Sequence, residues 1–351
     1  MTNIKNQTKR VRITWIDHVK TMGIFFVVYG HSLSTSWGIG HWIFSFHMPM
    51  FFFISGYLLR KSNASEGILS IARKQFYSLV PAYIVFSLVG YAFWFSVDRN
   101  FGVNADDVVY PIRTFLMIFY GSGTGELFHV KPVNLWFFPC LLIAQIIIAY
   151  TLRFPLKVQF LLSAMLCLLG LFMPTSIILP FELETALVAQ VFVFSGYVFK
   201  AKSWLKEIEK WNIKYALFLL CVGGALASIN GSIDMRISIY SNILLFFISS
   251  HLTILGLSAL LAKLDSHRLS SWISKNTIII FPTHHIVFTL FSGIYVYVLK
   301  LDLAVREDAI VGLVASAMNV MFIMFFIVPI CQKYLPVIYG LKSGEKSQLS
   351  R

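Results

Sequence analysis

Residues 13–33 read ITWIDHVKTMGIFFVVYGHSL, and this stretch decides the class of fold. It is apolar over most of its length, and a helix needs about 20 such residues to cross the hydrocarbon core of a membrane. Basic residues precede it, no cleavage site of the A-x-A kind follows it, and the run is too long for the core of a signal peptide. We therefore expect an uncleaved first membrane span.

The composition of the whole chain points the same way. Its 351 residues are 57% hydrophobic and 13% charged, with a mean hydropathy of +0.74. A soluble domain carries about 25% charged residues, so the composition excludes an ordinary cytosolic enzyme, a disordered protein and a secreted disulfide scaffold. The four cysteines lie in apolar runs without CxxC or CxxH spacing, and we expect them to be small buried hydrophobic residues.

The same length criterion, applied along the chain, predicts an all-α fold. We expect a polytopic integral membrane protein with about ten transmembrane helices that form a single domain over residues 1–351. The predicted spans are 13–33, 42–60, 76–97, 134–152, 158–174, 182–199, 213–230, 239–262, 277–299 and 309–331. The outer loop 98–133 is the one large connection, and its apolar segment 111–120 is too short to cross and is expected to lie in the interface or to re-enter the membrane.

The distribution of basic residues predicts the orientation, because Lys and Arg accumulate on the cytoplasmic side. With a cytoplasmic N-terminus, only six of the 29 basic residues face outward: Arg99, Arg113, Lys131, Arg236, Lys300 and Arg306. Both termini are therefore expected in the cytoplasm of a multi-pass protein of the inner or plasma membrane. The formal net charge of +13 is then a topological signal and gives no reason to expect a nucleic-acid partner.

Ionisable residues at membrane depth are costly and tend to be functional, and the first span holds three that we take as catalytic candidates. Asp17 and Lys20 lie near its cytoplasmic end and His31 near its outer end. Lys20 and His31 are eleven residues apart, which is about three turns and about 16 Å, so both lie on one helix face. The alternatives are that Lys20 snorkels to the headgroups and that His31 bonds a neighbouring helix.

The second span contains His47 and Pro49. The connector between the first two spans is short, so His31 and His47 are expected at similar depth on antiparallel neighbours. Pro49 cannot donate to the carbonyl of Ser45, which predicts a kink and a free acceptor there. Two histidines at one depth could bind a metal, but no third ligand stands at a suitable spacing, and we predict no metal.

Six residues are candidates for binding a substrate or cofactor: His47, Arg73, Lys74, Trp136, Glu184 and His284. The two basic residues precede the proline of the third span and could meet an anionic cofactor or only set the topology. The tryptophan could belong to the aromatic belt. Glu182 and Glu184 begin the sixth span, and the second of them could be drawn inward. His284 and His285 point about 100° apart on a helix, so at most one is expected to face a given cavity.

The second and sixth predicted spans contain a short similar sequence, ISGY at 54–57 and FSGY at 194–197. Small residues that allow close helix packing, followed by an interfacial Tyr, explain it without any chemistry. No GxSxG, P-loop, HExxH or dinucleotide-binding motif is present. These features are compatible with an enzyme and with a secondary transporter or exporter of a small metabolite, although inverted repeats are not evident.

Four segments of the chain resemble one family. The sequence RITWIDHVK at 12–20, followed by Gly30 and His31, resembles the opening of the membrane acyltransferase 3 family, whose hallmark is a basic residue, ten residues and a histidine. The sequence FHMPMFFFISGY at 46–57 is similar to the second span of its fucose 4-O-acetylase-like branch. The segments 135–137 and 276–284 also fit later helices of the family, and the resemblance spans most of the chain.

The resemblance implies an O-acetyltransferase that moves an acetyl group from cytoplasmic acetyl-CoA to a hydroxyl of a cell-surface polysaccharide or its sugar precursor. It maps the essential histidine to His31, as a general base or transient acyl carrier, and its basic partner to Lys20. The family often carries R-x-x-R before the proline of the third span, and here Ser78 stands where the second Arg is expected. The implied partners are acetyl-CoA, a sugar acceptor and the lipid bilayer, and the chain could also form homo-oligomers.

Overall fold

The computed structural model describes residues 13–32, 38–59, 68–101, 110–123, 133–174, 177–300 and 308–339. Within these ranges the regular elements are all helical, and the sole extended pairing is an isolated bridge between Asp234 and Ile239. The predicted all-α class is confirmed.

A helix occupies each of the ten predicted spans. They are α1 (Thr14–Gly30), α2 (Gly38–Leu58), α3 (Ile68–Phe93), α6 (Phe137–Thr151), α7 (Leu156–Leu171), α8 (Leu183–Ala201), α10 (Ile213–Asn230), α11 (Ile243–Leu261), α13 (Thr277–Gly293) and α14 (Ala309–Phe322). Three of them continue into π-helical turns: α3 into Trp94–Asp98, α13 into Ile294–Val298, and α14 into Ile323–Ile327, which leads to α15 (Val328–Tyr334).

Shorter helices lie between the long ones. They are α4 (Arg99–Phe101), α5 (Pro111–Tyr120), α9 (Trp204–Ile208) and α12 (Arg268–Lys275), together with 3₁₀ turns at Val133–Trp136, Pro180–Glu182, Met235–Ile237 and Pro336–Tyr339. The segment 111–120, which was predicted to be too short to cross the membrane, is a helix of ten residues. The amphipathic helix α12 was not predicted, and its residue Ser274 contacts Asp17 and Lys20 of α1.

Seven helical segments among the described residues are long and apolar enough to cross a membrane. They are Ile68–Phe101, Asn134–Thr151, Pro180–Ala201, Ile213–Asn230, Ile243–Leu261, Thr277–Val298 and Ala309–Tyr334. α7 is apolar but has 16 residues, and α1 has 17. The chain is thus a multi-pass membrane protein, while the count of ten spans and the orientation of the termini stay predictions.

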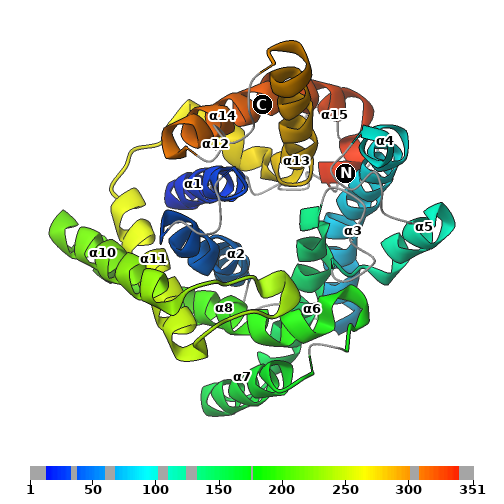
Figure 1. Cartoon of the computed structure of the whole chain (residues 1–351). Helices are drawn as coiled ribbons and strands as arrows, with labels where there is room; N and C mark the ends of the chain where they lie inside the picture. Colours follow the sequence, from blue (N-terminus) through cyan, green and yellow to red (C-terminus); the bar gives the residue numbers. More distant parts are fainter. Residues whose placement is uncertain are drawn as a thin grey trace, which may run out of the picture.

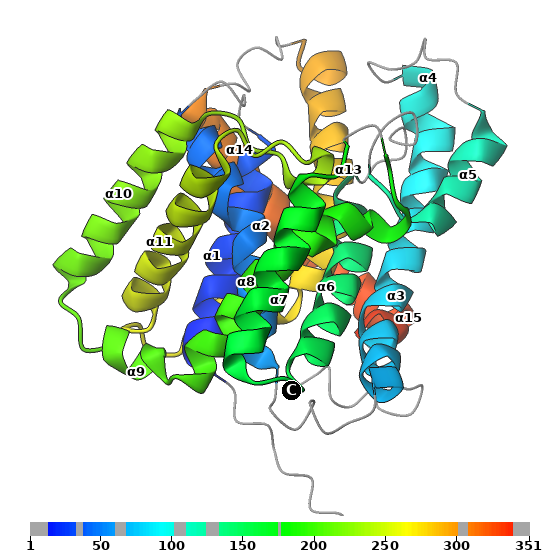
Figure 2. The same ribbon diagram turned by 90° about the horizontal axis from the view of Figure 1, so that it is seen from below.

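The long helices run side by side, with α1 and α2 adjacent and α10 and α11 beyond them, as Figures 1 and 2 show. α2 packs against α1, α8, α10 and α11, so it lies at the centre of one half of the bundle. α13 packs against α1, α3 and α14. α5 and α7 lie at the periphery (Figure 1). α13 is thereby brought against α1, which is far from it in the sequence and which also packs against α2.

The similar sequences ISGY and FSGY of the second and sixth predicted spans lie at a contact between α2 and α8. A methyl group added at Gly56 would overlap the backbone carbonyl of Val193, and one added at Gly196 would overlap the carbonyl of Phe53. Each glycine therefore allows the partner's backbone to approach, as small residues do between membrane helices. The prediction that these two sequences serve close helix packing is confirmed.

The acceptor predicted at Pro49 is also present. Because Pro49 has no N–H, the carbonyl of Ser45 lacks its usual helical donor. Ser250 of α11 places its hydroxyl 2.6 Å from that carbonyl oxygen, and both serines are fully buried. The proline thus creates a polar contact between α2 and α11.

Candidate active site

One end of α1 is joined to α12 by polar contacts. The carboxylate of Asp17 accepts hydrogen bonds from Ser274 (2.8 Å) and Ser271 (3.3 Å), and Lys20 donates through Nζ to the carbonyl of Ser274 at 2.8 Å. Asp17 is buried and Lys20 is half-buried. Since Ser274 belongs to the last turn of α12, the ammonium group lies where a helix favours positive charge. Both predicted catalytic candidates at this end therefore have protein partners.

This junction sets the register between α1 and α13. From the contact of Lys20 with Ser274, His31 is eleven residues further along and His284 is ten residues further along. At 1.5 Å per residue, His31 lies about 16 Å beyond the junction along α1, while His284 lies in α13, which begins at Thr277 after the break at Asn276. α1 and α13 pack against each other, so the register brings the two histidines to the same level.

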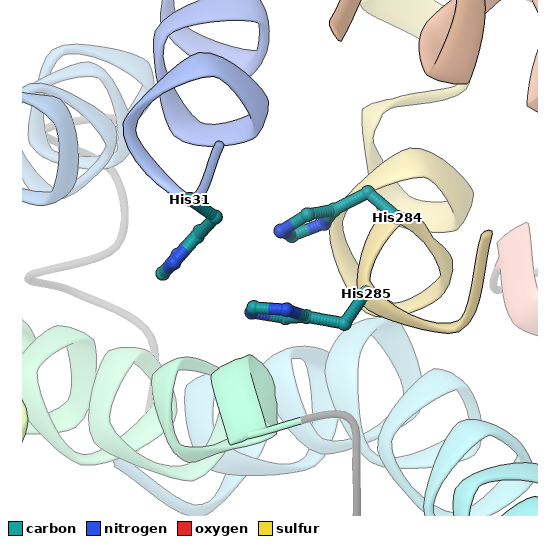
Figure 3. Close-up of side chains that lie close together, drawn as sticks. All are labelled: His31, His284 and His285. Atoms are coloured by element: carbon teal, nitrogen blue, oxygen red, sulfur yellow. The ribbon is translucent and has the colours of Figure 1, made fainter. Parts of the chain in front are cut away.

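Three histidines meet at that level, as Figure 3 shows. His31 follows the last residue of α1, and its ring centroid lies 4.4 Å from that of His285 and 5.3 Å from that of His284. The two α13 rings are stacked with centroids 4.5 Å apart. The ring of His47 from α2 lies 6.5 Å from that of His31, which confirms the predicted shared depth.

The prediction that at most one of His284 and His285 faces a common partner is wrong. Their Cα–Cβ bonds do diverge by about 100°, but His31 lies between the two directions, and both imidazoles reach it (Figure 3). Pro282, two residues earlier in α13, lies inside the helix, and the side chains of Thr283 and His284 approach the carbonyls of Ile279 and Ile280.

The sequence paired His31 with His47 and offered no third metal ligand, whereas the fold places two histidines of α13 beside His31. One nitrogen each from His31, His284 and His285 lies within 4.8 Å of the others. Neutral imidazole nitrogens are ligands that zinc accepts, and three of them with an open position make a known type of zinc site. The spacing argument failed because two ligands come from a helix more than 250 residues away.

Hydrogen bonds distinguish the rings in this cluster. His47 donates through Nδ1 to the carbonyl of Ile43 at 2.7 Å. His284 has Nδ1 at 3.2 Å from the carbonyl oxygen of Ile280 and Nε2 at 3.0 Å from Nδ2 of Asn134. No hydrogen bond joins the ring of His31 to any residue that the structure describes, and this ring is half-buried rather than sealed. His31 is thus the histidine best placed to meet a substrate.

A family model described as an acyltransferase domain matches residues 13–332 of the chain. The chain belongs to the acyltransferase 3 family. No curated protein and no solved structure matched it. Family membership and the apolar helices together make it a membrane acyltransferase, with the histidine cluster as its candidate active site.

The predicted binding residues of the acyltransferase lie in different surroundings. Arg73 and Lys74 are exposed on α3, eight and seven residues before Pro81, and the guanidinium of Arg73 lies 5.8 Å from the ring centroid of Tyr77. Trp136 is buried in the 3₁₀ turn that also carries Asn134, the partner of His284. Of these residues, only Trp136 shares a short element with a side chain that contacts the cluster.

Two carboxylates of the acyltransferase are drawn inward at the start of α8: Glu184, as predicted, and Glu182. Glu182 is fully buried and accepts hydrogen bonds from the backbone N–H of Gly123 at 2.6 Å and from Ser122 at 3.1 Å. Arg236 donates to the carbonyl of Gly123 at 3.0 Å. Glu184, on α8, is also buried, and its backbone carbonyl lies close to Gly170 of α7. Glu182 thus fixes the turn around Gly123, which lies against Trp136.

Sequence reasoning missed three residues of this site: Asn134, His285 and Glu182. Asn134 and Glu182 each stand at the first turn of an apolar span, where a polar residue is ordinarily interfacial, so neither gave a signal. His285 was set aside by the angular argument. The Pro-Thr-His-His run itself was the available signal, since two adjacent histidines inside an apolar span are rare.

Proposed function

We propose that this acyltransferase moves an acetyl group from cytoplasmic acetyl-CoA to a hydroxyl of a cell-surface polysaccharide or of its sugar precursor. The observation that supports the proposal is the position of His31, whose ring stands among three other histidines without a hydrogen bond to the described residues. The similarity of residues 46–57 to the fucose 4-O-acetylase-like branch supports a sugar as the acceptor.

A positioned imidazole supplies what this reaction needs. A sugar hydroxyl is a weak nucleophile at neutral pH, and a base that takes its proton during attack makes the attack feasible. In the proposed step the hydroxyl oxygen bonds the acetyl carbon, the thioester C–S bond breaks, and CoA leaves as its thiol. In this direct route His31 takes the proton of the hydroxyl and passes it to the leaving thiolate. In the alternative route a ring nitrogen of His31 first bonds the acetyl carbon as the C–S bond breaks, and the hydroxyl then displaces the ring nitrogen. Both routes require the same ring to be open to the substrates.

The other predicted residues have supporting roles in this proposal. Asp17 and Lys20 hold α1 against α12 and thereby fix the level of His31 beside α13. Arg73 and Lys74, exposed on α3, suit the phosphates of CoA because cationic side chains form strong hydrogen bonds with phosphate. With the predicted orientation, these residues lie toward the cytoplasm and His31 lies toward the outer side, where a glycan acceptor is available.

The test is NMR of surface polysaccharide from four strains: wild type, deletion, deletion complemented with the wild-type gene, and deletion complemented with His31→Gln. We expect acetyl signals in the wild type and the complemented strain only, with the variant protein present in the membrane at normal abundance. Acetyl signals that persist in the deletion strain would contradict the acceptor class. Normal acetylation by the variant would contradict the role of His31.

A further inference from the structure

The geometry points to Asn134 as a positioning residue that fixes the tautomer and the orientation of His284 beside His31. The inference rests on the proposed function, in which His31 is the group that reacts. Asn134 does not contact His31 in any described interaction; it acts through His284. The inference assigns different tasks to two histidines whose ring centroids are 5.3 Å apart.

The tautomer follows from the two partners of the His284 ring. A backbone carbonyl can only accept a hydrogen bond, so Nδ1, 3.2 Å from the oxygen of Ile280, carries the proton. In the neutral ring Nε2 then presents a lone pair. Asn134 must therefore present its NH₂ group, which donates across the 3.0 Å from Nδ2 to Nε2. Both side chains are buried, so no bulk water competes for these bonds.

The position of Asn134 is itself rigidly supported. It lies in the 3₁₀ turn Val133–Trp136, directly before α6, and its neighbours Leu135 and Trp136 are buried. The next residue, Phe137, packs its ring 5.2 Å from that of Phe281, which is one turn before His284 on α13. The turn and the histidine are thus held together by aromatic packing, so the amide donor has little freedom to leave Nε2.

The histidines of the cluster therefore have different roles. Both nitrogens of His284 are engaged, so this ring cannot accept a proton from a substrate without losing the bond to Asn134. The imidazole of His284 is instead held in one orientation and packs against the rings of His31 and His285. Without Asn134 the ring of His284 could rotate or change tautomer, and it could then compete with His31 for the proton.

Asn319 provides a matched control. It is fully buried on α14 and also bonds His284, but its Nδ2 donates to the backbone carbonyl of His284 at 2.9 Å. Asn319→Ala therefore removes a buried amide from the same residue without touching the imidazole. Any effect of general loosening around His284 should appear in both variants, whereas a tautomer effect should appear in Asn134 variants alone.

The test is nitrogen NMR of the full-length protein labelled with ¹⁵N-histidine and reconstituted in bilayers. The signals of His284 are identified by their loss in His284→Gln. We expect one protonated and one unprotonated nitrogen for His284 in the wild type and in Asn319→Ala. In Asn134→Asp, an isosteric change to a group that accepts, we expect Nε2 to become protonated. An unprotonated Nε2 in Asn134→Asp, or an unprotonated Nδ1 in the wild type, would overturn the inference.

Kinetics supply the second readout, with polysaccharide from the deletion strain as acceptor and acetyl-CoA as donor. We expect Asn134→Ala and Asn134→Asp to lower kcat by roughly tenfold to a hundredfold, as loss of an orienting partner does, with KM for acetyl-CoA little changed. Asn134→Gln, which keeps an amide donor, should recover part of kcat. Wild-type kcat in Asn134→Ala would overturn the inference. An inactive wild-type protein with the expected NMR signals would instead count against the proposed function alone.

Discussion

The two ends of α1 are polar for different reasons. At one end, Asp17 and Lys20 are bonded to serines of α12, and the contacts join two helices. At the other end, the ring of His31 has no hydrogen bond to a described residue and lies against the two rings of His284 and His285. The same helix therefore carries a structural junction and a candidate reactive group about 16 Å apart.

This contrast separates two kinds of polar residue in a membrane helix: those that stabilise the fold and those that meet a ligand or substrate. A buried polar group must find partners, and when protein groups supply them all, the residue stabilises the fold. A group that is left open beside other ionisable side chains is better explained by a ligand or a substrate. By this criterion we propose that His31 is the reactive residue and that Asp17 and Lys20 position it.

The largest effect is expected from His31→Gln. The amide keeps a similar size but cannot act as a base at neutral pH, so turnover of the purified enzyme should fall by about 10²–10⁴-fold. The thermal unfolding midpoint should stay close to that of the wild type, because the side chain of His31 makes no hydrogen bond to the described residues. A variant that unfolds at a much lower temperature would instead place His31 among the structural residues.

Zinc should inhibit the enzyme strongly. The nitrogens of His31, His284 and His285 lie close enough to be drawn onto one ion, and an ion held there would occupy the lone pair that His31 needs. Inhibition should be reversed by a chelator and weakened in His285→Gln. The chelator alone should leave the activity of the purified enzyme unchanged; loss of activity on chelation would mean that a metal takes part in the reaction.

Asp17→Ala should act mainly on stability. It leaves the hydroxyls of Ser271 and Ser274 without their acceptor, which should cost about 1–3 kcal/mol. The expected observation is a lower unfolding midpoint in detergent, with a smaller loss of turnover than in His31→Gln. Ser274→Ala, which removes one of the two bonds, is the matched control and should show an intermediate shift. Unchanged stability with lost activity would make Asp17 catalytic.

The smallest effect is expected from Lys20→Met, which keeps the apolar stem and removes the bond to the carbonyl of Ser274. A single charged donor at a helix end contributes about 0.3–1 kcal/mol, so the unfolding midpoint should fall slightly. KM for acetyl-CoA is the discriminating measurement. A rise of about tenfold in KM, equivalent to about 1.4 kcal/mol of binding, would show that Lys20 contacts the donor rather than α12.

The fold was largely predictable because apolar runs of about 20 residues have few alternatives in a membrane. Each predicted span coincides with a helix, and both the acceptor at Ser45 and the glycine contact at Gly56 followed from local chemistry. α12 was missed because its eight residues are amphipathic rather than apolar, so hydropathy passed over it.

The site was predictable only in part. His31, His47 and His284 stood out as costly polar residues, and the structure brings them together. The pairing of His284 with Asn134 was not accessible, because 150 residues separate them and only packing of the turn Val133–Trp136 against α13 closes the distance. The engagement of Asp17 and Lys20 by α12 was missed for the same reason.

The most direct test of the central claim uses the wild-type enzyme and diethyl pyrocarbonate, which modifies open imidazoles. Mass spectrometry follows the modification of each histidine while acetyl transfer is measured in parallel, and the exposed His267 serves as the control. We predict that activity falls in step with modification of His31 and that the polysaccharide acceptor slows both, while His267 reacts at its own rate. Retained activity after His31 is fully modified would contradict the account.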